Sequence, residues 1–196
     1  MDSPELLNNL PVILFESPTI FEQWLENHYA ELSGIWLKIA KKNSQRQSVS
    51  YAEALEVALC YGWIDGQKRA YDEQFFLQKF TPRRAKSIWS KVNVDKVVML
   101  IAEHKMKPSG LAVVEAAKKD GRWDQAYDSA STITTPPDFQ IALDQNPQAK
   151  EFFATLNKTN TYAILWRIQT AKTPQARQAK IEKLIDMLNR GQTIHP

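Results

Sequence analysis

Residues 50–93, SYAEALEVALCYGWIDGQKRAYDEQFFLQKFTPRRAKSIWSKVN, hold most of the features around which the rest of the chain can fold. The stretch begins with Ser50-x-x-Glu53, the spacing of a capping box, in which the two side chains satisfy free amide groups at the start of a helix. We expect this helix to stop at Gly62, because glycine tolerates the left-handed conformation common at helix ends.

A β-hairpin is expected directly after this helix. Residues 68–71 and 74–80 flank a two-residue acidic turn, and the second segment alternates in the way that a half-buried strand does. Residues 35–39 show the same alternation, and residues 12–15 form a short apolar run suited to an edge strand. Together these segments predict a small antiparallel sheet.

Helical signals account for most of the remaining chain. Ser17-Pro18 is a typical helix start, and Asn93 is expected to cap a further helix. In the last third, prolines 137, 147 and 174 each open an apolar stripe of helical spacing, and residues 162–169 carry another. The predicted fold is therefore α+β: a small antiparallel sheet packed with helices over residues 1–130, followed by a helical subdomain over residues 136–196.

Composition excludes several classes of protein. The chain has 196 residues, 43% of them hydrophobic, which is enough for a substantial core. A net charge of +3 is modest for a strong nucleic-acid binder. The single cysteine, Cys60, rules out an internal disulfide and fits a reducing compartment. Residues 1–18 are unlike a secretory signal and no apolar run is long enough for a membrane span, so we expect a cytoplasmic protein.

No metal or cofactor is predicted. The three histidines, His28, His104 and His195, are far apart in the sequence and show no metal-ligand spacing. Phosphate-binding glycine loops and glycine-serine-glycine nucleophile elbows are also missing from the sequence. Cys60 lies among apolar residues and is interpreted as part of the core rather than as a nucleophile.

The candidate site is a pocket for a small anionic or aromatic ligand in the central stretch. Arginines at the end of the hairpin offer planar guanidinium groups that suit phosphate or carboxylate, while serine, asparagine and tryptophan can add hydrogen bonds and a flat wall. The residues of this predicted site are Trp63, Asp65, Arg69, Arg83, Arg84, Ser87, Trp89, Ser90 and Asn93. In the alternative interpretation, Asp65 pairs with Arg69 or Arg83 to stabilise the hairpin and both tryptophans belong to the core.

Several ordered segments point to a family. They are Ala54-Leu55, Ala58-Leu-Cys-Tyr-Gly-Trp-Ile-Asp-Gly66, Phe80-Thr-Pro-Arg-Arg84, Ser87-Ile-Trp-Ser-Lys-Val-Asn93, Gly121-Arg-Trp-Asp124, residues 162–168, Ala171-Lys-Thr-Pro174, Arg177 and residues 181–191. From about residue 15 to residue 195 the chain thus resembles the YdeI/OmdA family, which is named for bacteriocin protection and for association with an outer-membrane porin. The last segments look like that family's helical tail.

The resemblance implies a non-enzymatic stress or antimicrobial resistance factor, acting against bacteriocins or cationic peptides, with an envelope or porin-associated protein as a possible partner. Two other classes stay open. One is an enzyme of unknown reaction that uses the pocket at residues 63–93. The other is a nucleic-acid-binding protein, for which the basic residues from Lys79 to Lys91, interleaved with aromatic ones, have suitable chemistry.

Overall fold

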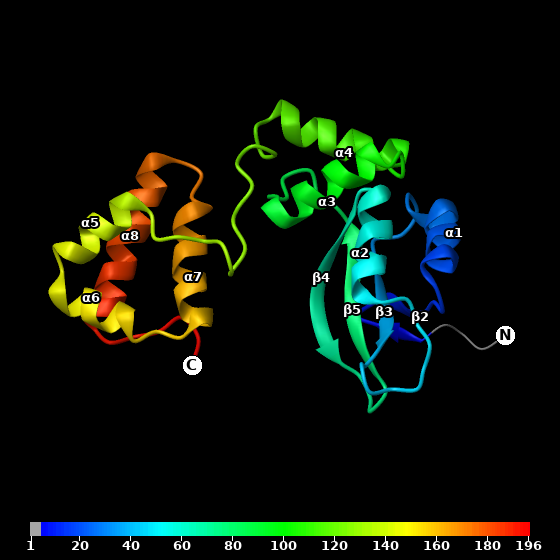
Figure 1. Cartoon of the computed structure of the whole chain (residues 1–196), viewed down its shortest axis with the longest axis horizontal. Coiled ribbons are helices and arrows are strands. Elements are labelled where there is room, and N and C mark those ends of the chain that lie inside the picture. The colour runs from blue at the N-terminus through cyan, green and yellow to red at the C-terminus, as the bar shows by residue number, and fades with distance from the viewer. Residues whose placement is uncertain (1–4) are drawn as a thin grey trace. The chain divides into compact units, whose positions relative to one another are not determined.

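The computed structural model in Figure 1 describes residues 5–196. The chain forms two compact units. The first comprises the described residues up to Trp89 together with Asn93–Gln125, and the second comprises Ser90–Val92 and Ala126–Pro196. None of the described helices is long and apolar enough to cross a membrane.

The first unit is built on a five-stranded sheet with the strand order β1-β2-β3-β5-β4. The strands are β1 (Leu6–Leu7), β2 (Leu10–Leu14), β3 (Ile35–Ala40), β4 (Trp63–Ala70) and β5 (Phe75–Pro82). Strands β2 and β3 run parallel because helix α1 (Pro18–His28) crosses over between them, and the other pairs are antiparallel. The α+β class is confirmed, but the sheet is mixed rather than wholly antiparallel.

The hairpin of β4 and β5 is longer than the sequence predicted. Strand β4 begins at Trp63 rather than Lys68, because a bulge between Asp65 and Lys68 interrupts the alternation that marks a strand. The buried side chain of Gln78 holds this bulge, since its Nε2 donates to the carbonyl oxygen of Gly66 over 2.9 Å. The hairpin register is thus fixed by a side chain on the neighbouring strand.

Helices α1 and α2 (Tyr51–Cys60) cover one face of the sheet (Figure 1). The ring of Phe21 in α1 lies 6.0 Å from the ring of Phe80 in β5, and the Tyr51 hydroxyl donates to Asp65 in β4 over 2.8 Å. The capping box predicted at the start of α2 is confirmed. This face carries the main core of the unit.

Helix α3 (Lys91–Ala102), from Asn93 onward, and helix α4 (Pro108–Lys119) complete the first unit. The expected cap at Asn93 is wrong, because the helix begins two residues earlier and Asn93 lies in its first turn. Helix α4 packs unusually closely on the end of α2: a β carbon at Gly110 would lie 2.2 Å from the Cys60 carbonyl oxygen. Only glycine fits at this position.

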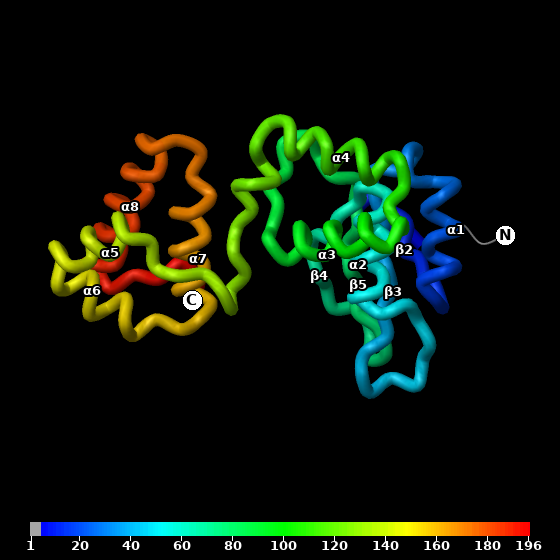
Figure 2. The backbone as a smooth tube through the Cα atoms, turned by 45° about the horizontal axis from the view of Figure 1, so that its top comes forward, coloured from blue at the N-terminus to red at the C-terminus, as the bar shows by residue number. Residues whose placement is uncertain are grey.

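The second unit consists of four helices, in agreement with the sequence pattern (Figure 2). They are α5 (Pro137–Asp144), α6 (Pro147–Ala154), α7 (Lys158–Gln169) and α8 (Pro174–Asn189). Their apolar stripes meet in a core of their own that includes Phe139, Ile164, Ile168 and Leu188.

One buried polar side chain ties the end of the chain to this core. Asn160 is 3% exposed, its Oδ1 accepts from the amides of Ile194 and His195, and its Nδ2 donates to the His195 carbonyl oxygen over 3.2 Å. Asn160 therefore replaces the hydrogen bonds that the terminal residues would otherwise make with water.

Candidate functional site

Four of the nine residues predicted as a pocket, Arg83, Arg84, Ser87 and Trp89, lie in the turn after β5, and two of them contact each other. Arg83 is 9% exposed, and its guanidinium carbon lies 3.6 Å from the centre of the Trp89 ring. Its Nη1 also donates to the Ile88 carbonyl oxygen over 3.0 Å. The rings of Trp89 and Trp123 pack edge to face with their centres 4.9 Å apart. Arg83 and Trp89 therefore pack against each other in a cation–π contact.

Arg122 fixes the same turn from the other side. Its Nη1 donates to the carbonyl oxygen of Ser87 over 2.9 Å, while its Nε lies 2.8 Å from the Asp120 carboxylate. Arginine 122 and Trp123 belong to the Gly121-Arg-Trp-Asp124 segment. The segment at residues 121–124 thus contacts the turn at residues 83–89, and this contact stabilises the backbone of the turn.

Three further predicted residues, Trp63, Asp65 and Arg69, lie in β4. Trp63 is buried at the start of β4 and donates from its Nε1 to the Tyr29 carbonyl oxygen over 3.1 Å. The Asp65 carboxylate accepts from the Tyr51 hydroxyl over 2.8 Å, and Trp63 and Trp89 are both buried, as the alternative interpretation expected. Arg69 and Arg84 are exposed.

The last two predicted residues are divided between the units. Ser90 pairs with Tyr127 in the second unit, and Asn93 belongs to the first. None of the nine residues lines either of the two hollows described below. A ligand pocket formed by them stays a prediction.

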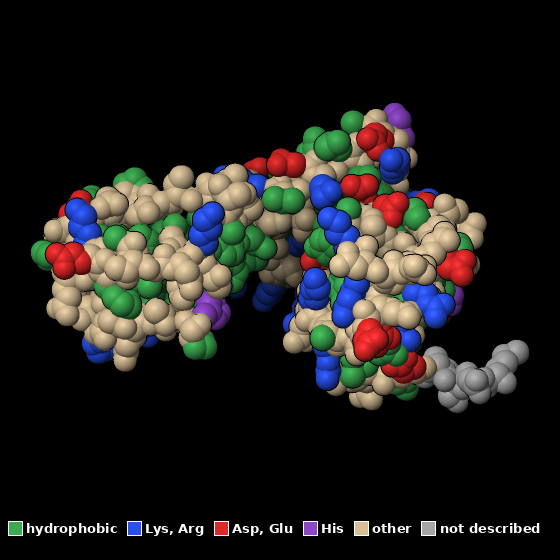
Figure 3. Space-filling model, turned by 60° about the horizontal axis from the view of Figure 1, so that its bottom comes forward, with side chains coloured by type: hydrophobic (Ala, Val, Ile, Leu, Met, Phe, Trp, Pro, Cys, Tyr) green, Lys and Arg blue, Asp and Glu red, His purple; other side chains and the backbone are tan. Residues whose placement is uncertain are grey.

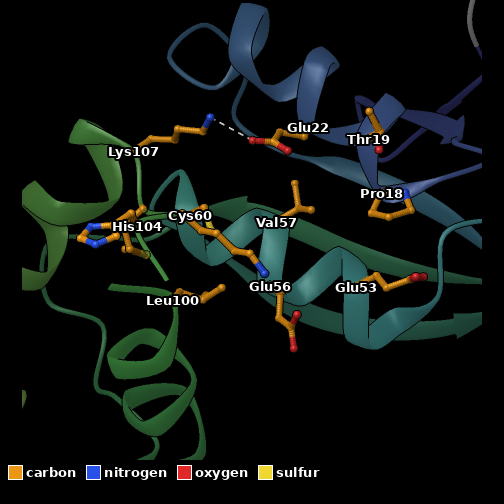
Figure 4. Close-up of a pocket in the computed structure, with 12 residues that line it drawn as sticks. Pro18, Thr19, Glu22, Glu53, Glu56, Val57, Cys60, Leu100, His104 and Lys107 are labelled. Atoms are coloured by element: carbon orange, nitrogen blue, oxygen red, sulfur yellow. Dashed lines mark ion pairs between the residues drawn. The ribbon is translucent and has the colours of Figure 1, made fainter. Parts of the chain in front are cut away.

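A groove of about 520 Å³ opens between α1, α2 and the connection from α3 to α4 (Figure 4). We call it the α2 groove. Its floor is apolar and contains Val57, Cys60, Leu100 and Met106. Its rim carries charges of both signs, from Glu22, Glu53, Glu56, Lys105 and Lys107. This volume is typical of sites for small ligands.

The end of the groove is shaped by the backbone of residues 103–107. The amide of Lys107 donates to the Cys60 carbonyl oxygen over 3.0 Å, which fastens the connection to the end of α2. His104 adopts a left-handed conformation with φ of 56°, so the chain can reverse direction before α4. The absence of a side chain at Gly110 allows this close approach.

Two ion pairs border the groove. Glu22 and Lys107 face each other across one end, with Oε1 and Nζ 2.9 Å apart (Figure 4). The hydrogen bond that the Lys107 ammonium donates to Glu22 raises the pKa of Lys107, so this amine stays charged at neutral pH. Glu56 pairs with Lys96 of α3 at 3.1 Å.

Glu53 is held ionised by the helix start. Its carboxylate accepts from the Ser50 amide over 2.9 Å, and hydrogen bonds from Ser50 lower its pKa. Glu53, Glu56, Val57 and Cys60 follow each other at helical spacing, so they share one face of α2. This pattern is the signal by which sequence reasoning could have found the groove.

Cys60 forms part of the floor and is 6% exposed. Burial raises the pKa of its thiol to about 11, with a further contribution from Glu22. The thiol is therefore protonated at neutral pH and lacks the reactivity of a thiolate. In this groove Cys60 acts as an apolar surface.

The second unit has a hollow of its own on α7, about 550 Å³ in volume. Ile133, Leu156, Tyr162 and Leu165 line it together with Ser131 and Lys158. The Tyr162 hydroxyl donates to the Asp128 carbonyl oxygen over 3.4 Å. Among residues 5–196 no group of three His, Cys, Asp or Glu side chains converges as a metal site would require.

Comparison with known families divides the chain at nearly the same place as the structure. Residues 13–113, more than half of the chain, match the family model described as "Domain of unknown function (DUF8412)". Residues 132–191 match the OmdA model, described as "Bacteriocin-protection, YdeI or OmpD-Associated". The resemblance to the YdeI/OmdA family is confirmed for this second segment. No curated protein and no solved structure gives a significant match.

Proposed function

The chain belongs to the family of the domain of unknown function DUF8412 and carries an OmdA region, and on this premise we propose that it protects bacteria against bacteriocins or cationic antimicrobial peptides. The protein acts by binding rather than by catalysis. The observation that carries the proposal is the match of residues 132–191 to a family described by bacteriocin protection.

The α2 groove is the binding site in this proposal. Val57, Leu100 and Met106 offer an apolar floor, and Glu53 and Glu56 place carboxylates beside it. An amphipathic ligand can bury its apolar part on this floor, where each square ångström of apolar surface removed from water contributes about 25 cal/mol. A positive group on the ligand then meets the carboxylate of Glu53, since Glu56 is paired with Lys96. Cationic amphipathic peptides have this chemistry.

The two ends of the groove differ in the charge that is available to a ligand. Lys107 is already paired with Glu22, so its charge is largely balanced. Lys105 pairs with Glu103, outside the rim, at 2.7 Å. The carboxylates on α2 lie toward the other end, where Glu53 is exposed and keeps its charge. We expect a ligand to place its cationic group over α2 and its apolar group near Leu100.

Survival of a bacteriocin-sensitive bacterial host tests the proposed function. Cells that express the protein should survive bacteriocin or cationic-peptide doses that kill cells with an empty vector. Val57→Trp fills the groove and should abolish the protection. Val98→Trp introduces the same side chain at a position that is 53% exposed and outside the groove, and it should leave the protection intact. Equal killing with and without the wild-type protein would refute the proposal.

A further inference from the structure

The hollow on α7 in the second unit, which we call the α7 hollow, differs from the α2 groove in its charge. Among the described residues that line it there is no acid, and Lys158 is the only charged one. Lys158 is exposed, and no carboxylate of residues 5–196 forms an ion pair with it. By contrast, the α2 groove is lined by Glu22, Glu53 and Glu56. A ligand in the α7 hollow therefore meets an unbalanced positive charge.

One face of α7 supplies both the cation and an apolar wall. Lys158, Tyr162 and Leu165 follow each other at helical spacing, so they share this face. Leu165 comes two helical turns after Lys158, about 10 Å along the helix axis. The hollow thus has a positive charge at the start of α7 and an apolar surface toward the middle of the helix.

The other walls come from the segments that precede α5 and α7. Ile133 and Leu156 are half-buried there and pack against the core of the unit. Two hydrogen bonds fasten the segment before α5 to α7. Gln169 Nε2 donates to the Asp128 carboxylate over 2.6 Å, and the Tyr162 hydroxyl donates to the Asp128 carbonyl oxygen over 3.4 Å. These contacts hold the walls of the hollow in place without a ligand.

The ionisable groups nearest in the fold leave the charge of Lys158 unbalanced. The Asp128 carboxylate is paired with Lys91 at 2.7 Å, and hydrogen bonds from Lys91 and Gln169 lower its pKa. Burial raises the pKa of Tyr162, so this hydroxyl is uncharged at neutral pH. Figure 3 shows hydrophobic side chains that reach the surface of the second unit beside Lys and Arg side chains.

An amphiphile with one anionic head and one apolar chain fits this arrangement. The volume of about 550 Å³ is typical of sites for small ligands. A chain that lies on Ile133, Leu156 and Leu165 loses water contact with each methylene that it buries. A carboxylate at the end of the chain can accept a charge-assisted hydrogen bond from Lys158. Nucleic acid and anionic membranes fit less well, because proteins bind them through several cations.

We propose that the α7 hollow binds a fatty acid, with its carboxylate at Lys158 and its chain directed toward Leu165. This activity is separate from the α2 groove, where Glu53 would repel an anion. It does not depend on the proposed protective function.

Isothermal titration calorimetry of the full chain with laurate, kept below the concentration at which it forms micelles, tests the proposal. Octanoate, which is shorter by four methylenes, should bind at least about tenfold more weakly, because each fully buried methylene tightens binding about fourfold. Lys158→Glu reverses the charge and should weaken laurate binding at least about fivefold. Lys183→Glu is the matched control, because Lys183 is an exposed lysine on α8 outside the hollow, and it should leave the affinity within about twofold of wild type.

A second pair of variants tests the space for the chain. Thr161→Trp places an indole in the hollow and should weaken laurate binding at least about tenfold. Thr159→Trp adds the same side chain at an exposed position of α7 outside the hollow and should leave the affinity within about twofold of wild type. Circular dichroism checks that each variant keeps its helices. If the indole at residue 161 disturbs them, the exposed pair Lys158→Glu and Lys183→Glu decides the outcome.

Four results would overturn the proposal. Laurate does not bind the wild-type protein, or Lys183→Glu weakens binding as much as Lys158→Glu. The Thr161→Trp and Thr159→Trp proteins keep their helices and bind laurate equally well. Vesicles of phosphatidylglycerol bind through Lys158 while laurate does not.

Discussion

Gly110→Ala should destabilise the first unit, although alanine is ordinarily the better residue in a helix. Gly110 lies in the first turn of α4, where the change alone would stabilise the helix by about 0.5–1 kcal/mol. The new β carbon, however, would lie 2.2 Å from the Cys60 carbonyl oxygen and 2.8 Å from its carbonyl carbon. Both are backbone atoms, so no side-chain rotation can relieve the clash.

Helix α4 must therefore move away from α2. Overpacking of this kind costs about 1–3 kcal/mol, and the shift also strains the hydrogen bond from the Lys107 amide to Cys60, worth about 1 kcal/mol. After subtraction of the helix term, we expect the free energy of unfolding to fall by about 1–3 kcal/mol. In a chain of this size the melting temperature should drop by roughly 3–10 °C.

Urea unfolding followed by tryptophan fluorescence measures this change. Five of the six tryptophans, Trp24, Trp36, Trp63, Trp89 and Trp123, belong to the first unit, so the signal reports mainly on it. Gly66→Ala is the control, because the nearest atoms would be 3.7 Å away, and it should change stability by less than about 0.5 kcal/mol. A Gly110→Ala protein as stable as wild type would refute the close packing of α4 on α2.

Three further substitutions test other contacts. Arg83→Ala should lower the free energy of unfolding by about 2 kcal/mol because it removes the contact with Trp89. Arg84 is exposed, so Arg84→Ala should change the free energy of unfolding by less than about 0.5 kcal/mol. Urea titration of the two variants measures this difference. Asn160→Ala should lower the free energy of unfolding of the second unit by about 2–3 kcal/mol. Circular dichroism measures this as a lower melting temperature of the helices. An unchanged melting temperature would contradict the role of Asn160 in holding residues 194 and 195. The hydrogen bond from Arg177 lowers the pKa of Asp138 in the folded protein. This pair therefore stabilises the fold fully at pH values above the carboxyl's unfolded pKa of about 3.9. The stabilisation is lost as the pH falls through the lower pKa of the folded state. Asp138→Asn should remove this part of the acid dependence, and an identical pH profile of unfolding for the variant would refute the assignment.

Local signals in the sequence predicted the helices well. The capping box at Ser50 and the proline starts of α5, α6 and α8 depend on residues within one turn, so they can be read without knowledge of the rest of the fold. The start of β4 was missed because the bulge after Asp65 breaks the alternation. The parallel pairing of β2 with β3 depends on the path of α1, which no local pattern records.

The candidate site was harder to predict than the fold. The chemistry of Arg83 and Trp89 suggested an anion pocket, and nothing in the sequence indicated that Arg83 packs on Trp89 or that Trp89 packs on Trp123, a contact between distant segments. The α2 groove needs Glu22 from α1 and Lys107 from the α3–α4 connection, and these residues come together only in the folded unit.

Isothermal titration calorimetry with a cationic amphipathic peptide tests the central claim most directly. The peptide should bind the wild-type protein and Val98→Trp with similar affinity, because Val98 lies outside the α2 groove. Val57→Trp should bind at least about tenfold more weakly, a loss of about 1.4 kcal/mol, since its indole occupies the apolar floor. Equal affinity of the Val57→Trp and Val98→Trp proteins would contradict the groove as the binding site.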